Sequence, residues 1–147
     1  MSDKYPIKVS ELKINHYLII KDRPCKLIDM SISKTGKHGH AKAHIVALDI
    51  FNGNKYEIIE STSKEIWIPE VKRFTYTLVD IDQDGYISLI SDENETREDL
   101  NFNSSLVPAY FSDPTFTKTE IEERLDEDDV IVVTLRALGI EMITEFK

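Results

Sequence analysis

The sequence contains a single cysteine and no long apolar run. Cys25 has no partner for an internal disulfide, so a disulfide-stabilised scaffold is excluded and a reducing compartment is expected. No apolar segment approaches the roughly 20 residues that a membrane-spanning helix needs. The first ten residues are polar and of mixed charge, which does not match a secretory signal. We therefore expect a cytoplasmic protein that does not bind membranes.

Catalytic patterns are also missing. No acid and base pair or activated nucleophile stands at a spacing that exceeds chance, so we expect a protein that is not an enzyme and has no small-molecule substrate. Cys25 lies in the segment RPCKLIDM beside an apolar run, which favours a buried, inert thiol over a nucleophile. The function is therefore expected to depend on binding.

Acidic residues are absent between Asp29 and Asp49, although the chain has a net charge of -9. The charge is +3 over residues 1–69 and -12 over residues 70–147. Residues 33–42, SKTGKHGHAK, hold three lysines inside the acid-free stretch. This asymmetry predicts a local contact with a polyanion, led by the basic segment, because the acidic half would repel nucleic acid.

Most of the chain has the alternation and β-branched content of short strands. Pro69, together with the change of charge, indicates a boundary between two domains, residues 1–69 and 70–147. Many short strands with one or two helices predict two small β-barrels. The expected strands are YLIIKD (17–22), PCKLIDMSI (24–32), KAHIVALDIF (42–51), KYEIIES (55–61), FTYTLVDI (74–81), GYISLIS (85–91) and DVIVVTLRAL (129–138).

Local signals predict one hairpin turn and two helices. Asn52-Gly53 tolerates the positive φ angles that a hairpin turn needs, so a turn is expected there. Thr117 and Glu120 form a capping box at the start of a helix over residues 117–125. A second short helix is expected over residues 140–146, IEMITEF.

Residues 80–91, DIDQDGYISLIS, resemble a calcium-binding loop, with Asp80, Asp82 and Asp84 at the first ligand positions. Ser91 stands where a bidentate glutamate would complete the shell, and the flanks alternate like strands instead of helices. A turn between two strands, with Gly85 at positive φ, is the favoured interpretation. A calcium or metal module is kept as a weak alternative.

The basic segment admits several interpretations. It lacks the first glycine and the hydroxyl of a phosphate-binding P-loop. A metal site could use His38, His40 and His44, but no cysteine or carboxylate joins them and neighbouring lysines disfavour a cation. A solvated hairpin tip is the simplest alternative. The residues alone do not decide between a solvated hairpin tip and a functional loop.

The fourth interpretation is a presented lysine. Gly36 and Gly39 bracket Lys37, so the backbone can turn sharply there and carry the lysine outward between two strands. Lys34 and Lys42 add positive potential that favours phosphate oxygens, and crowded cations ease deprotonation of a lysine that must react. The segment is thus predicted to present Lys37 to an anionic partner.

The segment SKTGKHGHAK resembles the modification loop of the eukaryotic translation factor 5A family, the hypusine-containing translation factors. The resemblance extends in order and spacing through residues 23–57, the tripeptide VKR and residues 84–100. It departs at Ile32, where a threonine is usual, and at IESTSKEIWIP. It implies an SH3-like barrel followed by an OB fold.

The resemblance implies that Lys37 is the hypusine site. A deoxyhypusine synthase would attach an aminobutyl group from spermidine, and a deoxyhypusine hydroxylase would add a hydroxyl; no other cofactor is implied. It further implies a translation elongation and termination factor that binds the large ribosomal subunit beside peptidyl-tRNA and assists difficult sequences such as polyproline. The loop positions implied in enzyme recognition or RNA contact are Lys34, Gly36, His38, Gly39, His40 and Lys42. The alternative is a generic OB-fold protein that binds single-stranded RNA or DNA.

Overall fold

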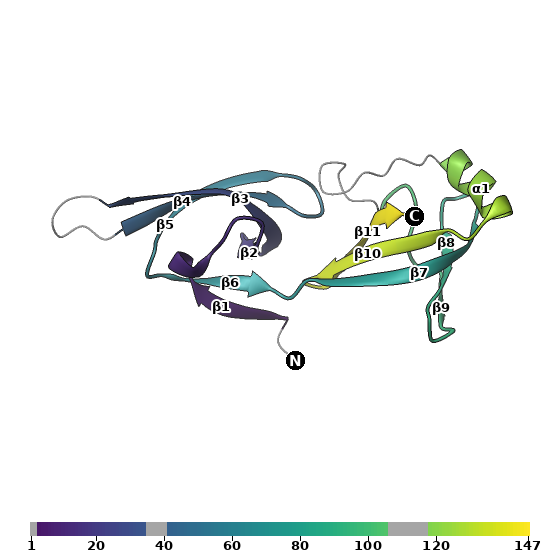
Figure 1. Cartoon of the computed structure of the whole chain (residues 1–147), viewed down its shortest axis with the longest axis horizontal. Helices are drawn as coiled ribbons and strands as arrows, with labels where there is room; N and C mark the ends of the chain where they lie inside the picture. The colour runs from purple at the N-terminus through teal and green to yellow at the C-terminus, as the bar shows by residue number, and fades with distance from the viewer. Residues whose placement is uncertain (1–2, 35–40, 106–117) are drawn as a thin grey trace. The chain divides into compact units, whose positions relative to one another are not determined.

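The computed structural model describes residues 3–34, 41–105 and 118–147. The chain divides into two compact units, Met1–Val71 and Lys72–Lys147, and the boundary predicted from the sequence lies two residues earlier. Both units consist mainly of antiparallel strands (Figure 1). The prediction of a mostly β chain with an OB fold in its second half is confirmed. No helix among the described residues is long and apolar enough to cross a membrane.

The first unit contains a four-stranded antiparallel sheet and a separate two-stranded ribbon. The sheet has the order β2-β3-β4-β5, and the ribbon pairs β1 with β6. A short 3-10 helix, η1, follows β1 and donates the backbone amide of Val9 to the carbonyl of Lys64. The elements are β1 (Lys4–Lys8), η1 (Val9–Glu11), β2 (Tyr17–Ile20), β3 (Arg23–Lys34), β4 (Ala41–Asp49), β5 (Lys55–Ser61) and β6 (Glu65–Pro69).

The core of the first unit lies between the sheet and the ribbon. Alternate residues of β4 point inward, which buries Ala43, Ile45 and Ala47 completely. The ribbon contributes Ile66 and Ile68 to the same cluster. Cys25 belongs to this cluster and is fully buried; burial, followed by the charge of Asp49, raises the pKa of its thiol to about 12. The prediction of a buried cysteine is confirmed, and the raised pKa favours the neutral thiol.

The predicted turn at Asn52-Gly53 is confirmed. Gly53 has φ 78° and its amide donates to the carbonyl of Asp49 over 3.0 Å, which closes the β4–β5 hairpin. The Asp49 carboxylate is fully buried and accepts hydrogen bonds from the amides of Phe51 and Asn52. The guanidinium of Arg23 donates to the same carboxylate, with 2.6 Å between Nε and Oδ2. Burial raises the pKa of Asp49, but these hydrogen bonds outweigh burial and the pKa lies below its ordinary value.

The second unit is built on a five-stranded antiparallel sheet of order β11-β10-β7-β8-β9. One helix, α1, packs against β7 and buries Ile121 in the core of the unit. This helix agrees with the predicted one, although the capping residue Thr117 lies outside the described residues. The elements are β7 (Lys72–Ile81), β8 (Ile87–Ile90), β9 (Thr96–Arg97), α1 (Lys118–Glu127), β10 (Ile131–Ala137) and β11 (Ile140–Phe146).

The prediction of a second helix over residues 140–146 is wrong. This segment is strand β11, which pairs antiparallel with β10. Leu138 and Gly139 both have positive φ, 50° and 79°, and form the two-residue turn between the strands. The turn aligns the segment with the apolar strand β10, and the ladder of hydrogen bonds outweighs the local preference for a helix.

The segment that resembles a calcium loop is a turn between β7 and β8, as predicted. Gly85 has φ 92°, and the Asp82 carboxylate accepts hydrogen bonds from the amides of Asp84 and Tyr86. The Asp82 side chain therefore stabilises the turn by accepting from backbone amides two and four residues further on. Among the residues that the structure describes, no group of three or more histidine, cysteine, aspartate or glutamate side chains is placed to hold a metal.

An ion-pair network joins the two edges of the sheet in the second unit. Arg97 on edge strand β9 donates to both carboxylate oxygens of Glu141 on edge strand β11, at 2.9 and 3.0 Å. Glu141 also accepts hydrogen bonds from the hydroxyl of Thr134 and the guanidinium of Arg136. Its side chain is only 10% exposed. Side-chain contacts between the edge strands β9 and β11 thus close the sheet of the second unit into a barrel.

This network predicts a sensitivity to acid. Burial raises the pKa of Glu141, but hydrogen bonds from Thr134, Arg97 and Arg136 outweigh it and the pKa lies below its ordinary value. The associated stability is complete above the ordinary carboxyl pKa, about 4.3, and is lost as pH falls through the lower folded value. In urea unfolding, the second unit of the wild type should weaken progressively below about pH 5. Glu141→Gln should flatten that dependence, whereas Glu123→Gln, at an exposed site on α1, should keep the wild-type profile; equal profiles for all three would contradict the network's role.

Candidate functional site: the β3–β4 hairpin

Strands β3 and β4 form an antiparallel hairpin that ends beyond the core of the first unit. The last pairs of the ladder are Ser33 with Lys42 and Lys34 with Ala41. Lys34, Ser33 and Lys42 are exposed, whereas Ala43, two residues into β4, is fully buried. Figure 1 shows the ends of the two strands lying together at one end of this unit. The buried part of β4 therefore anchors a hairpin whose last two pairs carry exposed cations.

A β-bulge separates the buried and exposed parts of β3. Leu27 pairs with Ala47 and Asp29 pairs with Val46, so Ile28 has no partner across the strand and is 40% exposed. Up to Leu27 the strand contributes to the core, and from Ile28 to Lys34 none of its residues is fully buried. A bulge increases local twist and redirects the strand. After the bulge, only Met30 still packs against the core, and β3 continues as one arm of the hairpin.

Thr62, in the turn that follows β5, stabilises the base of the hairpin. Its amide and its hydroxyl both donate to the carbonyl of Ala41, at 3.1 and 3.2 Å. The carbonyl of Thr62 in turn accepts the amide of Ser10 in η1. The first residue of β4 is therefore tied through Thr62 to two further elements. This role of Thr62 is not predictable from the sequence, because hydrogen bonds between residues 21 positions apart have no local signature.

The structure describes two of the predicted loop residues, Lys34 and Lys42. Both lie at the end of the hairpin, on opposite strands, and both are exposed. The other predicted residues lie outside the described residues: Gly36, Lys37, His38, Gly39 and His40. Lys37 belongs to the six residues that connect Lys34 to Ala41 along the chain. The roles assigned to these residues stay predictions.

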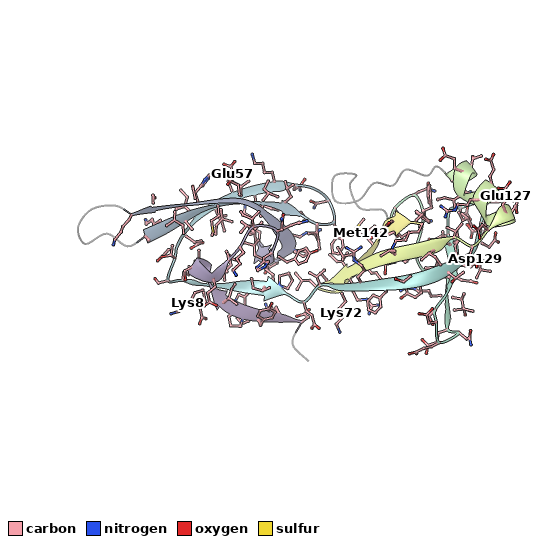
Figure 2. All side chains as sticks on the ribbon, in the orientation of Figure 1. Lys8, Glu57, Lys72, Glu127, Asp129 and Met142 are labelled. Carbon is pink, nitrogen blue, oxygen red and sulfur yellow. The ribbon has the colours of Figure 1, made fainter. Side chains whose placement is uncertain are left out.

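His44, the third histidine considered for a metal site, lies on β4. Its ring is exposed, and Nε2 lies 3.9 Å from a carboxylate oxygen of Glu57 on β5. Glu57 projects from β5 (Figure 2) and also contacts Lys55 over 3.2 Å. His44 thus belongs to the surface of the three-stranded part of the sheet, where Ser31 and Ile59 are its cross-strand neighbours.

The fold and the hairpin define a two-domain, β-rich protein with an exposed basic hairpin in the first domain and an OB fold in the second. Comparison with family models shows the same division. Residues 2–64 match the N-terminal domain described as translation initiation factor 5A-like. Residues 70–147 match the domain described as eukaryotic elongation factor 5A hypusine, DNA-binding OB fold. The chain belongs to the translation factor 5A family.

Individual relatives extend over nearly the whole chain. The chain is 45% identical over 138 residues to eukaryotic translation initiation factor 5A-1 of Schizosaccharomyces pombe, covering 93% of this chain and 81% of that protein. It is 42% identical over 153 residues to eukaryotic translation initiation factor 5A of Trypanosoma brucei brucei, covering 97% and 86%. A solved structure of a translation initiation factor eif-5a family protein from Naegleria fowleri aligns with a TM-score of 0.81 at 37% identity, covering 99% of each chain. The relatives support a role as a translation factor.

Proposed function

We propose that this translation factor acts on the ribosome through a hypusine at Lys37, beside peptidyl-tRNA. The observation that carries the proposal is the β3–β4 hairpin, whose ladder continues past the core to the exposed pair Ser33 and Lys42. The chain between its two arms contains Lys37. The match of residues 70–147 to a family model named for hypusine supports the presence of this modification, and the choice of Lys37 rests on its position in the sequence.

The chemistry of the proposed modification suits this location. In the proposed transfer, the carbon–nitrogen bond between the aminobutyl group and the central nitrogen of spermidine breaks, and 1,3-diaminopropane leaves with a proton from the lysine amine. A new carbon–nitrogen bond forms to the side-chain nitrogen of Lys37. The later hydroxylation replaces a C–H bond by C–OH and takes its oxygen and oxidising power from dioxygen at the hydroxylase. The product is longer than lysine, gains a second amine and keeps its positive charge. Such a group can reach phosphate or ribose oxygens in a narrow RNA-lined cleft. The modifying enzymes proposed as partners are a deoxyhypusine synthase and a deoxyhypusine hydroxylase.

The proposed effect on translation is positional. The modified side chain would contact the acceptor end of peptidyl-tRNA and favour a productive geometry where the substrates react poorly, as at consecutive prolines, and would also assist termination. Holding two reactants in a productive orientation can account for a large part of a rate enhancement. The reaction centre belongs to the ribosome, and the cytoplasm is the proposed location.

A reconstituted translation assay tests the proposal. Protein produced with both modifying enzymes should increase the rate of polyproline synthesis, whereas protein with an unmodified Lys37 should leave it near the rate without factor. Intact mass and peptide mapping over residues 34–42 establish which form is present. A template without consecutive prolines serves as the control and should respond weakly. Equal rates with modified and unmodified protein on the polyproline template would contradict the proposed role of Lys37.

The alternative of a generic single-stranded nucleic-acid binder is disfavoured by charge. The second half of the chain carries -12, and a groove that follows a phosphate backbone is normally positive. Salt-dependent binding of free oligonucleotides that is unchanged by Lys37→Arg would support this alternative.

A further inference from the structure

Along one of its two edges, strand β7 pairs with a neighbouring strand over only part of its length. On one side, β10 pairs with β7 from Lys72 to Thr77. On the other side, β8 pairs with β7 only from Thr77 to Ile81, because β8 ends at Ile90 and the chain turns away. Within the described ranges of the second unit, the part of β7 from Lys72 to Tyr76 therefore has a strand neighbour on one side only. Lys72 marks the beginning of this part in Figure 2.

The direction of the backbone groups follows from the register. Leu78 donates its amide to the carbonyl of Val130 over 2.8 Å, so the amide of Leu78 points toward the β10 side. Backbone groups of successive strand residues point to opposite sides in an antiparallel sheet. Phe74 and Tyr76 therefore direct their amides and carbonyls toward β10. Arg73 and Thr75 direct theirs toward the uncovered edge, where two amides and two carbonyls can pair with an added strand.

A groove of about 640 Å³ lies along this edge. One wall is β7, the other is the turn that connects β8 to β9, and Arg136 of β10 contributes at the end. In Figure 1, the β8–β9 hairpin extends away from the rest of the second unit. The lining residues are Arg73, Phe74, Thr75, Tyr76, Ser91, Asp92, Glu93, Glu95, Thr96, Arg97 and Arg136. Side chains from both faces of β7 line the groove, as expected for a space beside the edge of a strand.

The wall opposite β7 is negatively charged. Asp92, Glu93 and Glu95 are exposed, and none of them forms an ion pair with another described residue. The hydroxyl of Ser91 accepts hydrogen bonds from the amides of Glu93 and Glu95, which fixes the turn that bears the carboxylates.

The arginines of the groove neutralise this wall only in part. Arg97 and Arg136 are paired with carboxylates outside the wall, Asp99 and Glu141. Arg73 is then the one lining cation without an ion pair in the described part of the chain, against three carboxylates. The groove as a whole therefore favours a positively charged occupant.

We propose that the groove between Lys72–Tyr76 of β7 and the β8–β9 turn binds an extended peptide segment rich in lysine or arginine, which adds to the sheet as a strand. Hydrogen bonds to Arg73 and Thr75 would hold the backbone of the peptide, and the carboxylates of the turn would select its basic side chains. The rings of Phe74 and Tyr76 already stack with the guanidinium groups of Arg136 and Arg97. The proposed contacts therefore come from the backbone of β7 and from the carboxylates of the turn. The site is independent of the chemistry at Lys37 and would recruit a basic protein partner through the second domain.

Synthetic peptides test the backbone and charge requirements separately. The probe is a labelled eight-residue peptide that alternates lysine and valine, and its binding to the full-length protein is measured by fluorescence anisotropy. A peptide that alternates glutamate and valine should bind at least about tenfold more weakly. A lysine–valine peptide with N-methylated amides keeps the charge but cannot donate its backbone hydrogens, and should lose about tenfold in affinity.

Two variants of the protein locate the site. Thr75→Pro removes an amide that points to the uncovered edge and leaves the amides that face β10 unchanged, so the fold is expected to persist. The triple variant Asp92→Lys, Glu93→Lys, Glu95→Lys reverses the charged wall. The matched control Glu123→Lys, Asp126→Lys, Glu127→Lys makes the same change of net charge on exposed positions of α1. Both groove variants should weaken the lysine–valine peptide about tenfold, and the control should stay within about twofold.

Amide chemical shifts on labelled protein complete the test. The peptide should shift Arg73, Thr75 and the β8–β9 turn, and thermal unfolding should confirm that each variant is folded. Absence of binding, an unchanged affinity of the N-methylated peptide, or equal losses in the groove and control triple variants would each overturn the proposal. Displacement of the peptide by a single-stranded oligonucleotide with the same shift pattern would also overturn it, in favour of a nucleic-acid site.

Discussion

Cells that depend on the variant Lys37→Arg should lose translation of polyproline sequences while the protein remains folded. Arginine keeps the positive charge, but its guanidinium cannot accept the aminobutyl group in the way that a lysine amine does. A contact that needs the longer diamine would therefore be lost altogether. The measurement is a reporter with consecutive prolines, normalised to one without them, and the reporter should fall to the level of cells depleted of the factor.

A conservative substitution on strand β5 provides the control. Lys55→Arg changes an exposed lysine on β5 that contacts Glu57, and arginine can keep that contact. It should support wild-type reporter levels. Wild-type polyproline translation by Lys37→Arg, with circular dichroism showing normal folding of both variants, would rule out a hypusine at this position as the functional group.

The replacement of Asp49 by alanine should destabilise the first unit by about 3 kcal/mol. It breaks a part-buried ion pair with Arg23, and it leaves the buried amide of Phe51 and the part-buried amide of Asn52 without an acceptor. The carboxylate is fully buried and binds the guanidinium of Arg23 and the amides of Phe51 and Asn52. Asp49→Asn should cost less, because the side-chain oxygen can still accept from the amides of the turn. Urea unfolding followed by fluorescence isolates this unit, since Trp67 on β6 is the only tryptophan of the chain.

Asp29→Ala is the matched control for this series. Asp29 lies on β3 immediately after the bulge, and its side chain is exposed. Its substitution should change the free energy of unfolding by less than about 0.5 kcal/mol. If Asp49→Ala were as mild as Asp29→Ala, the hydrogen bonds and the ion pair of the Asp49 carboxylate would not be a principal support of the β4–β5 hairpin.

The parts of the fold that the sequence predicted correctly have local causes. The turns at Asn52-Gly53 and at Asp82 to Gly85 depend on residues that tolerate positive φ or bond to their own backbone. Helix α1 follows from the pattern of residues 117–125. Each of these signals lies within a few positions along the chain, so one sequence suffices to detect it.

The features that the sequence did not predict depend on contacts between distant residues. Strand β1 exists because it pairs with β6, in a register that joins Lys4 to Pro69. Strand β11 pairs through a turn whose first residue, Leu138, has φ 50°, an uncommon conformation for leucine that propensity argues against. Propensity alone assigned β11 to a helix, and only its alignment with β10 makes it a strand.

The sequence predicts the basic residues of the candidate site, but it does not predict the contacts that hold the base of the hairpin. The basic segment and its lysines stand out from composition, because acids are absent between Asp29 and Asp49. The bulge at Ile28 and the two hydrogen bonds from Thr62 to Ala41 were not predictable, since both are properties of the paired strands. A sequence can thus indicate what a loop presents without revealing what holds its base.

The ion pair between Arg97 and Glu141 marks the line along which the two edge strands of the second domain, β9 and β11, meet. Its two partners lie on the edge strands of the sheet, and β9 is held to β8 by only two residue pairs. Parting β9 from β11 along this line breaks side-chain contacts and leaves the ladder between β10 and β7 in place. In hydrogen exchange, the amides of β9 should therefore exchange earlier than those of β10, and added salt should widen the difference because it screens the pair. The barrel would open transiently and repeatedly between β9 and β11 while the remaining strands of the domain stay paired.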